Sequence, residues 1–370
     1  MHKFIRLLAV LTLLGMVAAA CGGGEDAETA DSSTTTVAET TTTQAPTTST
    51  TASTTTTTEA PDLGPAFPLS GEAIGDADAP NHPAVVIKVS NNDATARAAT
   101  MGLDLADIVY EERIEQGATR FAAVFHSEFP SEVGSVRSGR TSDVDIVSNL
   151  NRPVFAYSGA NDGVSAQLRA AENDGLLLRA SADFNDSEFR RISDFSAPNN
   201  LVVDALALSE RAEDSEPPAP VFDYSDNVLE FGTGSAGVEI TARTNATYVW
   251  SGEDGGYQRF QGGDRHETRD GVQITPTNVV VLTTTYVPSQ IDAASVDAIT
   301  IGGGPVVVYS GGFRVEGEWT RDFPRDPFTL TTPEGDTIGL APGQTWVSLT
   351  PGGTASEISL DRADELRTTS

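Results

Sequence analysis

Alternating apolar and polar residues mark the first ordered run of the chain. Val85, Ile87 and Val89 fall on one face of an extended segment, and Lys88 falls on the other. This period of two predicts a β-strand over residues 83–92. A lysine on such a strand either faces solvent at a sheet edge or forms an ion pair and several hydrogen bonds. The pattern alone leaves both interpretations open.

Two further apolar, β-prone runs, residues 108–110 and 121–125, flank a turn-like connection at residues 115–118. They predict an antiparallel pair of strands. Such a pair brings Glu111, Glu112 or Arg113 close to Thr119 and Arg120. Arg120 then either holds the hairpin together through a carboxylate or faces a ligand.

Helical patterns are interleaved with these strands. Thr141 or Ser142 can cap a helical run over residues 143–150, whose early aspartates suit the helix dipole. Residues 152–161 predict a buried strand that ends in a small-residue turn, followed by a helix from Asp162. Residues 202–208 predict another helix, with Asn199 and Asn200 in capping position.

A Pro/Glu-rich gap at residues 213–220 separates this mixed region from a second one in which strands and turns dominate. The glycine run at residues 302–305 is interpreted as a turn. We find no internal repeat. The expected strands after the gap, mostly antiparallel, are residues 228–231, 238–242, 246–250, 257–261, 279–286, 305–309, 313–319 and 346–349.

The amino terminus predicts the compartment. Residues 1–20 combine a basic start, an apolar run and small residues, which is typical of a secretory signal peptide. Cys21 follows directly and is the only cysteine, so we predict that it carries a lipid anchor and that disulfides are excluded. The Thr/Ser/Ala-rich residues 21–66 contain few large apolar side chains and predict a disordered tether.

Charge narrows the list of partners. The net charge is −30, with 23 basic and 53 acidic residues, which argues against nucleic acid as a partner. Four arginines nevertheless fall within 28 positions, at Arg113, Arg120, Arg137 and Arg140. Arginines on a small-residue loop before a helix are a frequent anion-binding arrangement. Internal ion pairs with the abundant carboxylates are the alternative.

Several catalytic and cofactor patterns are excluded by their surroundings. A strand, not a helix, is expected after the glycines of residues 232–237, so this run is not a dinucleotide-binding turn. No histidines stand at zinc spacing, and we expect no metal and no cofactor. Glu111 and Glu112 should face opposite sides of their strand, so they do not form a glycosidase pair.

Several motifs carry a resemblance to a known family, at residues 106–111, 117–121, 133–140, 156–159, 197–201, 278–280, 317–319 and 343–346. On these motifs the chain resembles the YerB-like family of bacterial envelope lipoproteins. Two positions depart from the family pattern: Ser135 stands where the family usually has Pro, and Asn199 stands where it usually has His, which weakens any role for a histidine base there. Lys88 and Asn91 match a Lys and an Asn on the family's first strand.

The resemblance implies an α+β fold. We expect a layered sheet-and-helix domain of the ββα-sandwich type over residues 67–212, a linker at 213–220, a β-rich domain over 221–360 and a tail at 361–370. The resemblance also implies an extracytoplasmic location at the cell membrane. It does not indicate an enzymatic activity.

Our leading hypothesis is a lipid-anchored envelope protein that binds an anionic or glycan cell-wall component. A hydrolase or transferase acting on envelope polymer, with Glu111 or Asp143 as acid or base, is the enzymatic alternative. A protein-docking module for an envelope partner, without a small-molecule site, is the third. The candidate ligand-binding residues are Lys88, Asn91, Glu111, Arg120, Arg137, Ser138, Arg140, Tyr157, Ser158, Gly159 and Asn200.

Overall fold

The computed structural model describes residues 65–75, 80–212, 215–225 and 232–369. The signal peptide, Cys21, nearly all of the tether and the strand expected at 228–231 lie outside these ranges. The described fold is a mixed, strand-rich α/β structure, as the sequence predicts.

An eleven-stranded sheet forms the centre of the fold, in the order β19-β18-β17-β14-β20-β2-β3-β1-β5-β6, with β9 paired to β18. Its strands are β1 (Val85–Asn91), β2 (Ile108–Arg113), β3 (Thr119–Phe125), β5 (Val154–Tyr157), β6 (Leu178–Ser181), β9 (Thr233–Gly234), β14 (Asn278–Thr283), β17 (Gly302–Ser310), β18 (Phe313–Arg321), β19 (Thr329–Thr331) and β20 (Thr345–Thr350).

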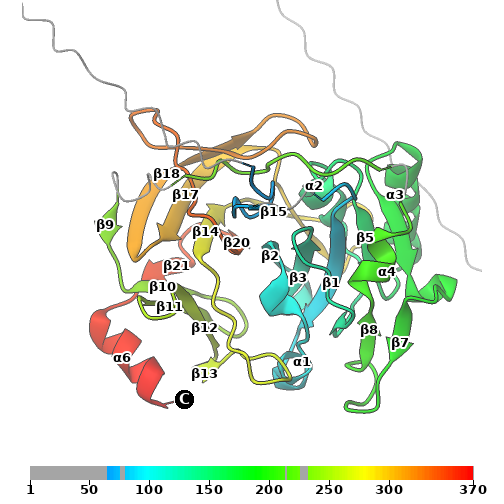
Figure 1. Cartoon of the computed structure of the whole chain (residues 1–370), viewed down its shortest axis with the longest axis horizontal. Coiled ribbons are helices and arrows are strands. Elements are labelled where there is room, and N and C mark those ends of the chain that lie inside the picture. The colour runs from blue at the N-terminus through cyan, green and yellow to red at the C-terminus, as the bar shows by residue number, and fades with distance from the viewer. Residues whose placement is uncertain (1–64, 76–79, 213–214, 226–231, 370) are drawn as a thin grey trace, which may run out of the picture. The chain divides into compact units, whose positions relative to one another are not determined.

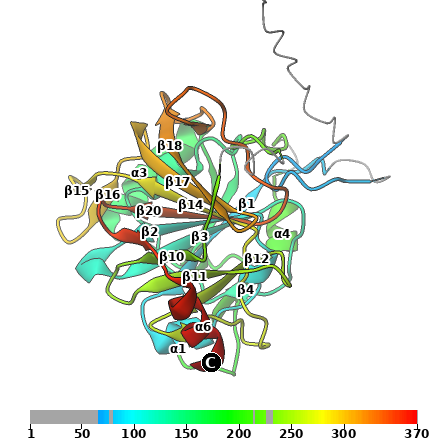
Figure 2. The same ribbon diagram turned by 90° about the vertical axis from the view of Figure 1, so that its left-hand side faces the viewer.

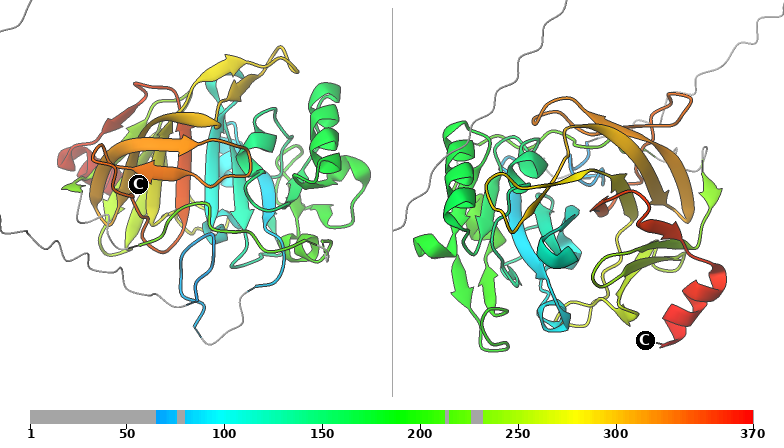
Figure 3. Two further views of the ribbon diagram at one scale, coloured as in Figure 1. Left: turned by 90° about the horizontal axis from the view of Figure 1, so that it is seen from above. Right: turned by 180° about the vertical axis from the view of Figure 1, so that it is seen from behind.

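Strand β20 joins the two halves of the chain in this sheet. It pairs in parallel with β2 from the first half and with β14 from the second. Figure 2 shows β14, β20, β2 and β3 side by side. Seen from above in Figure 3, the red β20 stands between the cyan and the orange strands. The main-chain hydrogen bonds of one sheet therefore run across both regions that the composition separates.

Smaller elements cover the two faces of the sheet. A five-stranded sheet has the order β13-β12-β11-β10-β21, a three-stranded sheet the order β4-β8-β7, and β15 pairs with β16. These strands are β4 (Val133–Gly134), β7 (Phe189–Arg191), β8 (Leu201–Val203), β10 (Gly237–Ile240), β11 (Ala246–Ser251), β12 (Gly256–Gln261), β13 (Asp264–Arg265), β15 (Tyr286–Pro288), β16 (Val296–Ala298) and β21 (Ala355–Glu357).

The helices lie mostly in the first half, and Figure 1 shows their places. The described α-helices are α1 (Ala94–Ala98), α2 (Asp143–Val147), α3 (Asp162–Asn173), α4 (Ala205–Ser209) and α6 (Leu360–Thr369), and the short 3₁₀ helices are η1 (Leu103–Leu105), η2 (Glu115–Gly117) and η3 (Ala182–Phe184). The sequence left open whether residues 361–370 are ordered. Residues up to 369 are helical.

Two apolar cores form because side chains alternate between the faces of a strand. On one face, Val86 and Tyr110 pack with α2 and α3 through residues such as Ile146 and Leu168. On the other face, Val109 and Phe121 pack with Trp346 and the five-stranded sheet. The antiparallel pairing of β2 with β3 confirms the predicted hairpin.

Two local predictions are wrong. Residues 201–203 form strand β8, and the helix that follows begins only after Asp204, whose side chain accepts the Ala207 N–H as the N-cap. Tertiary pairing with β4 and β7 overrides the helical pattern here. The glycine run at 302–305 is the start of β17, not a turn. A side chain at Gly304 would meet the Thr283 carbonyl oxygen at 2.8 Å, so a strand can pass there only with glycine.

Candidate functional site

The loop that carries Arg137, Ser138 and Arg140 lies where β1 and β5 separate. These strands are parallel, and their pairing ends at Ile87 and Ala156. Beyond that point the loop takes the place of β5: the Ser90 N–H donates to the Ser135 carbonyl at 3.0 Å, and the Arg137 N–H donates to the Lys88 carbonyl at 2.8 Å. In open α/β sheets, ligands bind at the carboxyl ends of strands where neighbours diverge.

Two backbone hydrogen bonds fix the loop to the end of β5. The Ser158 N–H donates to the Arg137 carbonyl at 2.9 Å, and the Gly139 N–H donates to the Gly159 carbonyl at 3.1 Å. Gly159 is required, because its φ is +150° and a Cβ there would lie 2.3 Å from Asp183 Oδ2. Ser158 and Gly159 thus support the arginine loop through their backbone.

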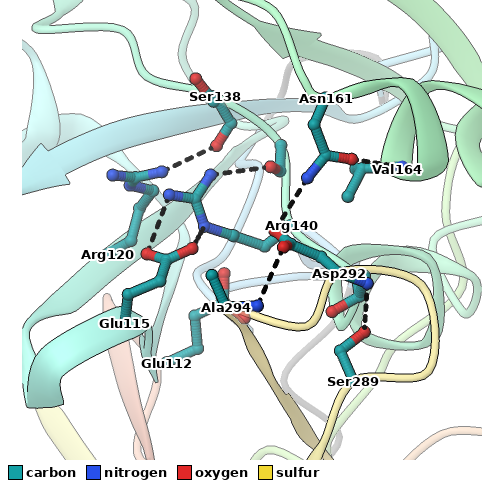
Figure 4. A network of polar contacts seen from close by, with 12 residues as sticks. Glu112, Glu115, Arg120, Ser138, Arg140, Asn161, Val164, Ser289, Asp292 and Ala294 are labelled. Atoms are coloured by element: carbon teal, nitrogen blue, oxygen red, sulfur yellow. Dashed lines mark hydrogen bonds and ion pairs between the residues drawn. The ribbon is translucent and has the colours of Figure 1, made fainter. Parts of the chain in front are cut away.

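Arg120 and Arg140 meet at this loop (Figure 4). Arg120 Nη1 donates to the Ser138 carbonyl at 3.1 Å, and Nη2 donates to Asn92 Oδ1 at 3.4 Å. Arg140 Nη1 donates to the neighbouring Gly139 carbonyl at 3.0 Å. Among the described residues, Arg120 has no carboxylate within ion-pair distance.

Glu115 binds only one of these guanidinium groups. Its two oxygens lie 2.9 Å from Arg140 Nε and 3.0 Å from Arg140 Nη2, so this pair is bidentate and partly exposed. The pKa of Arg120 is lowered to about 10, mainly by burial and also by the positive charges of Arg140 and Arg137, while Glu112 and Glu115 act in the opposite direction. Positive charge is therefore crowded around Arg120.

Arg137 binds the segment at residues 197–200. Its guanidinium donates to the Pro198 carbonyl and to Asn199 Oδ1. No carboxylate lies within ion-pair distance of Arg137 in the described part of the chain. Burial lowers the pKa of Arg137, Asp93 opposes this, and Arg191 adds to it. Asn199 is thus a direct partner of the arginine loop.

Lys88 lies beneath this loop in a closed ion cluster. Lys88 Nζ is 2.6 Å from Glu112 Oε1 and 2.7 Å from Asp143 Oδ1, and all three side chains are at most 1% exposed. Because β1 is an interior strand, the solvent-facing interpretation of Lys88 is wrong. The cluster leaves no room for a ligand at Lys88, which instead joins β1, β2 and the start of α2.

Glu111 lies on the opposite face of the sheet. It binds Arg259 Nη2 at 3.1 Å and accepts hydrogen bonds from Trp346 Nε1 at 3.0 Å and Thr119 Oγ1 at 2.7 Å. Asn91 Nδ2 contacts the same carboxylate at 3.3 Å. The alternation along β1 and β2 thus separates Glu111 and Asn91 from Lys88, and the structure does not gather the candidate residues into one site. Glu111 and Glu112 face opposite sides, as expected.

Tyr157 and Asn200 contact residues outside the arginine loop. Tyr157 is 2% exposed and packs against Phe155. Burial raises the pKa of its hydroxyl, and the positive charge of Arg179 opposes this. Asn200 accepts from Arg191 Nη1 at 2.7 Å and donates to the Ile192 carbonyl, within the β7–β8 hairpin. It is not a helix cap.

The sequence analysis missed Arg259, although the alternation of its strand could have found it. Arg259 lies two residues from Tyr257 and therefore shares its buried face in β12. Its guanidinium lies 4.8 Å from the Trp346 ring centroid, a cation–π contact between the two sheets. The missed partners Asn92 and Glu115 carry no such periodic signal, because they stand at strand ends and in a turn.

No group of three metal-binding side chains occurs among residues 65–75, 80–212, 215–225 and 232–369. Across the same ranges no helix is long and apolar enough to cross a membrane. Surface hollows of about 360, 460 and 340 Å³ lie near Arg314, Gln258 and Arg269, and the loop arginines do not line them.

Comparison with known proteins gives consistent matches. Residues 69–218 match the model described as "Protein of unknown function (DUF3048) N-terminal domain", and residues 237–347 match that of its C-terminal domain. The chain is 27% identical over 288 residues to "Putative lipoprotein YerB" of Bacillus subtilis (strain 168), covering 74% of this chain and 83% of that protein. The crystal structure of YerB from Bacillus subtilis is 22% identical, with a TM-score of 0.69, and covers 80% of this chain and 100% of that one.

Proposed function

This chain belongs to the family defined by the DUF3048 N-terminal and C-terminal domains, and from that premise we propose that it is a lipid-anchored extracytoplasmic protein that binds an anionic envelope component. Cys21 is the anchor, in keeping with the name of its Bacillus relative. Arg120, Arg137 and Arg140 receive the anion.

One observation carries the binding proposal: of the three guanidinium groups around one loop, only that of Arg140 is ion-paired within the described part of the chain, with Glu115. The positive charges of Arg140 and Arg137 lower the pKa of Arg120. A phosphate or carboxylate would relieve this repulsion and can take bidentate hydrogen bonds from arginine. Arg137 and Arg140 are both half-buried, so each keeps part of its surface for a ligand.

The enzymatic alternative receives less support from the carboxylates. The two proposed acids or bases are already bound: donors surround Glu111, and Asp143 binds Lys88 and the Arg140 N–H. A protein-docking role is the remaining competitor, because internal contacts already use part of each arginine.

The test is thermal unfolding of the protein with added teichoic-type polyphosphate, inorganic phosphate or wall-derived muramyl peptide. A ligand at 100 times its dissociation constant should add about 2.7 kcal/mol, which corresponds to roughly 5–10 °C for a domain of this size. Arg137→Gln and Arg140→Gln should each remove most of the shift, and added salt should weaken it.

Arg265→Gln is the matched control, since this arginine is exposed in β13 and its partners within the described ranges are Glu267 and Gln273. Its shift should equal that of the unchanged protein. If no anion raises the unfolding temperature, the binding proposal fails and the protein-docking role gains. An equal loss of the shift in Arg265→Gln would show general charge attraction without a site.

A further inference from the structure

The buried cluster of Lys88, Glu112 and Asp143 lies beneath the arginine loop and has an unusual composition. One ammonium and two carboxylates are enclosed with at most 1% of any side chain exposed. The adjacent apolar residues of the same core are Val86, Tyr110, Ala122, Val144 and Phe155. Enclosing such charges away from water is unfavourable unless hydrogen bonds compensate fully.

Compensation is incomplete at Glu112. Lys88 binds its Oε1, whereas Oε2 is buried and has no hydrogen-bond partner among the described residues. Burial raises the pKa of Glu112, which Lys88 only partly offsets. A low-dielectric site of this kind favours neutral forms, so transfer of a proton from the Lys88 ammonium to a carboxylate becomes accessible.

Asp143 is arranged differently from Glu112. Its Oδ1 contacts Lys88 Nζ at 2.7 Å, and its Oδ2 accepts the Arg140 backbone N–H at 2.6 Å. The amine nitrogen therefore contacts an oxygen that is bonded directly to Cγ. The backbone N–H of Arg140 holds the second carboxylate oxygen in place. A donor in that position stabilises an oxyanion that forms on attack at the carbon. Within the described ranges, Glu112 has no such donor on Oε2, so this oxygen is available to accept and release a proton.

We propose that Lys88 and Asp143 join through an intramolecular amide bond, with Glu112 as the proton-transfer residue. After one ammonium proton moves to Asp143 Oδ1, the neutral amine attacks Cγ, and the N–H of Arg140 holds the charge on Oδ2. Glu112 takes a proton from Nζ and delivers it to the departing Oδ1 hydroxyl. The C–N bond forms, the C–O bond breaks and one water leaves. No oxidant, reductant or cofactor takes part.

The bond would cross-link β1 to the start of α2, between residues 55 positions apart. Closing a loop of this length restricts the unfolded chain, as a disulfide does. The chain has one cysteine, Cys21, so an internal disulfide is not available to it. Lys88 is the only lysine besides Lys3, which lies in the expected signal peptide, so the side-chain amine that reacts is unambiguous.

The test is the intact mass of the full chain, followed by peptide mapping. We expect a mass lower than the sequence requires by one water, a branched peptide joining Lys88 to Asp143, and no tryptic cleavage after Lys88. If the intact mass of the unchanged protein shows no loss of water, the proposal is overturned, and no variant is needed for this conclusion. A water lost from peptides that exclude Lys88 also overturns it.

Glu112→Gln identifies the proton carrier. It keeps the shape of the side chain but cannot take the amine proton, so the full mass and cleavage after Lys88 should return. Asp143→Ala should give the same result by removing the acceptor carbon. Circular dichroism establishes whether each variant is folded, and a folded Glu112→Gln that still loses water contradicts the assigned role of Glu112.

Discussion

Single residues in this protein obtain their properties from burial more than from their neighbours in sequence. The alternation of residues 85–89 correctly predicts that Lys88 points away from the face of Ile87. Its pairing with Glu112 and Asp143 depends on β2 and α2, which lie 24 and 55 positions away. The side-chain direction of Lys88 is a local property, and its partners are not.

Asp107 provides a pH-dependent test of burial. Burial raises the pKa of this carboxyl from its ordinary value to about 6, although it accepts the N–H groups of Ser127 and His126. The folded state therefore holds the proton more tightly than the unfolded state. The stability contributed by this group is fully present below about pH 4 and is lost as pH rises through about 6.

Asp107→Asn should remove this dependence, because an amide keeps an acceptor oxygen and does not ionise. Between pH 4 and pH 7, the unfolding free energy of the unchanged protein should fall by about 2 kcal/mol relative to the variant. Urea unfolding at several pH values measures the difference. Parallel pH curves for the two proteins would show that Asp107 does not titrate in this range.

The helices and strands that could be predicted are those with a strong period of apolar residues and, for helices, a capping residue. Helix α3 begins at Asp162 as expected, and its N-cap Asn161 accepts the Val164 N–H at 2.9 Å. The helix predicted for residues 202–208 was wrong at its start, because a short apolar run such as residues 201–203 suits a helix or a strand equally. Pairing with β4 and β7 selects the strand.

Gly317 in β18 tests how tightly neighbouring strands pack. A Cβ there would lie 2.2 Å from the Thr331 carbonyl oxygen and 2.7 Å from Ile338 Cδ1. Gly317→Ala should therefore lower the unfolding free energy by about 1–3 kcal/mol, through displacement of β19. Chemical denaturation provides the measurement. Gly234→Ala in β9 is the control, since a Cβ there meets nothing within 4 Å; equal losses for both would contradict the packing explanation.

For the whole described molecule, β20 is the element that both halves share. A chain ending at residue 344 would lack β20, and the facing edges of β2 and β14 would lose their main-chain partners. Both halves should then lose their cooperative structure, because unpaired buried N–H and C=O groups are costly. Circular dichroism and limited proteolysis at residues 108–125 measure the loss.

A chain ending at residue 358 is the control for this truncation. It removes α6, whose Ala363 and Leu366 pack against Val249 and Phe260, and retains β20. It should remain folded, with a smaller loss of stability. If the chain that ends at residue 344 keeps its first half folded, the two halves are independent despite their shared sheet.

The sequence by itself determined what depends on local pattern and composition. The strand-rich α/β class, the β2–β3 hairpin and the opposite directions of Glu111 and Glu112 follow from periods of two or from turn residues. The position of the arginine loop before a helix was equally visible. These features involve residues close in the chain, where geometry is nearly fixed by the backbone.

Only the tertiary structure decided which of these residues meet. It placed Lys88 with Glu112 and Asp143 on one face, and Glu111 with Arg259 and Trp346 on the other. It also inserted β20 beside β2, which no local pattern indicates because the two strands lie more than 230 positions apart. Long-range pairing follows from the burial of apolar faces and the satisfaction of buried polar groups throughout the fold, and these are properties of the assembled sheet, not of any single segment.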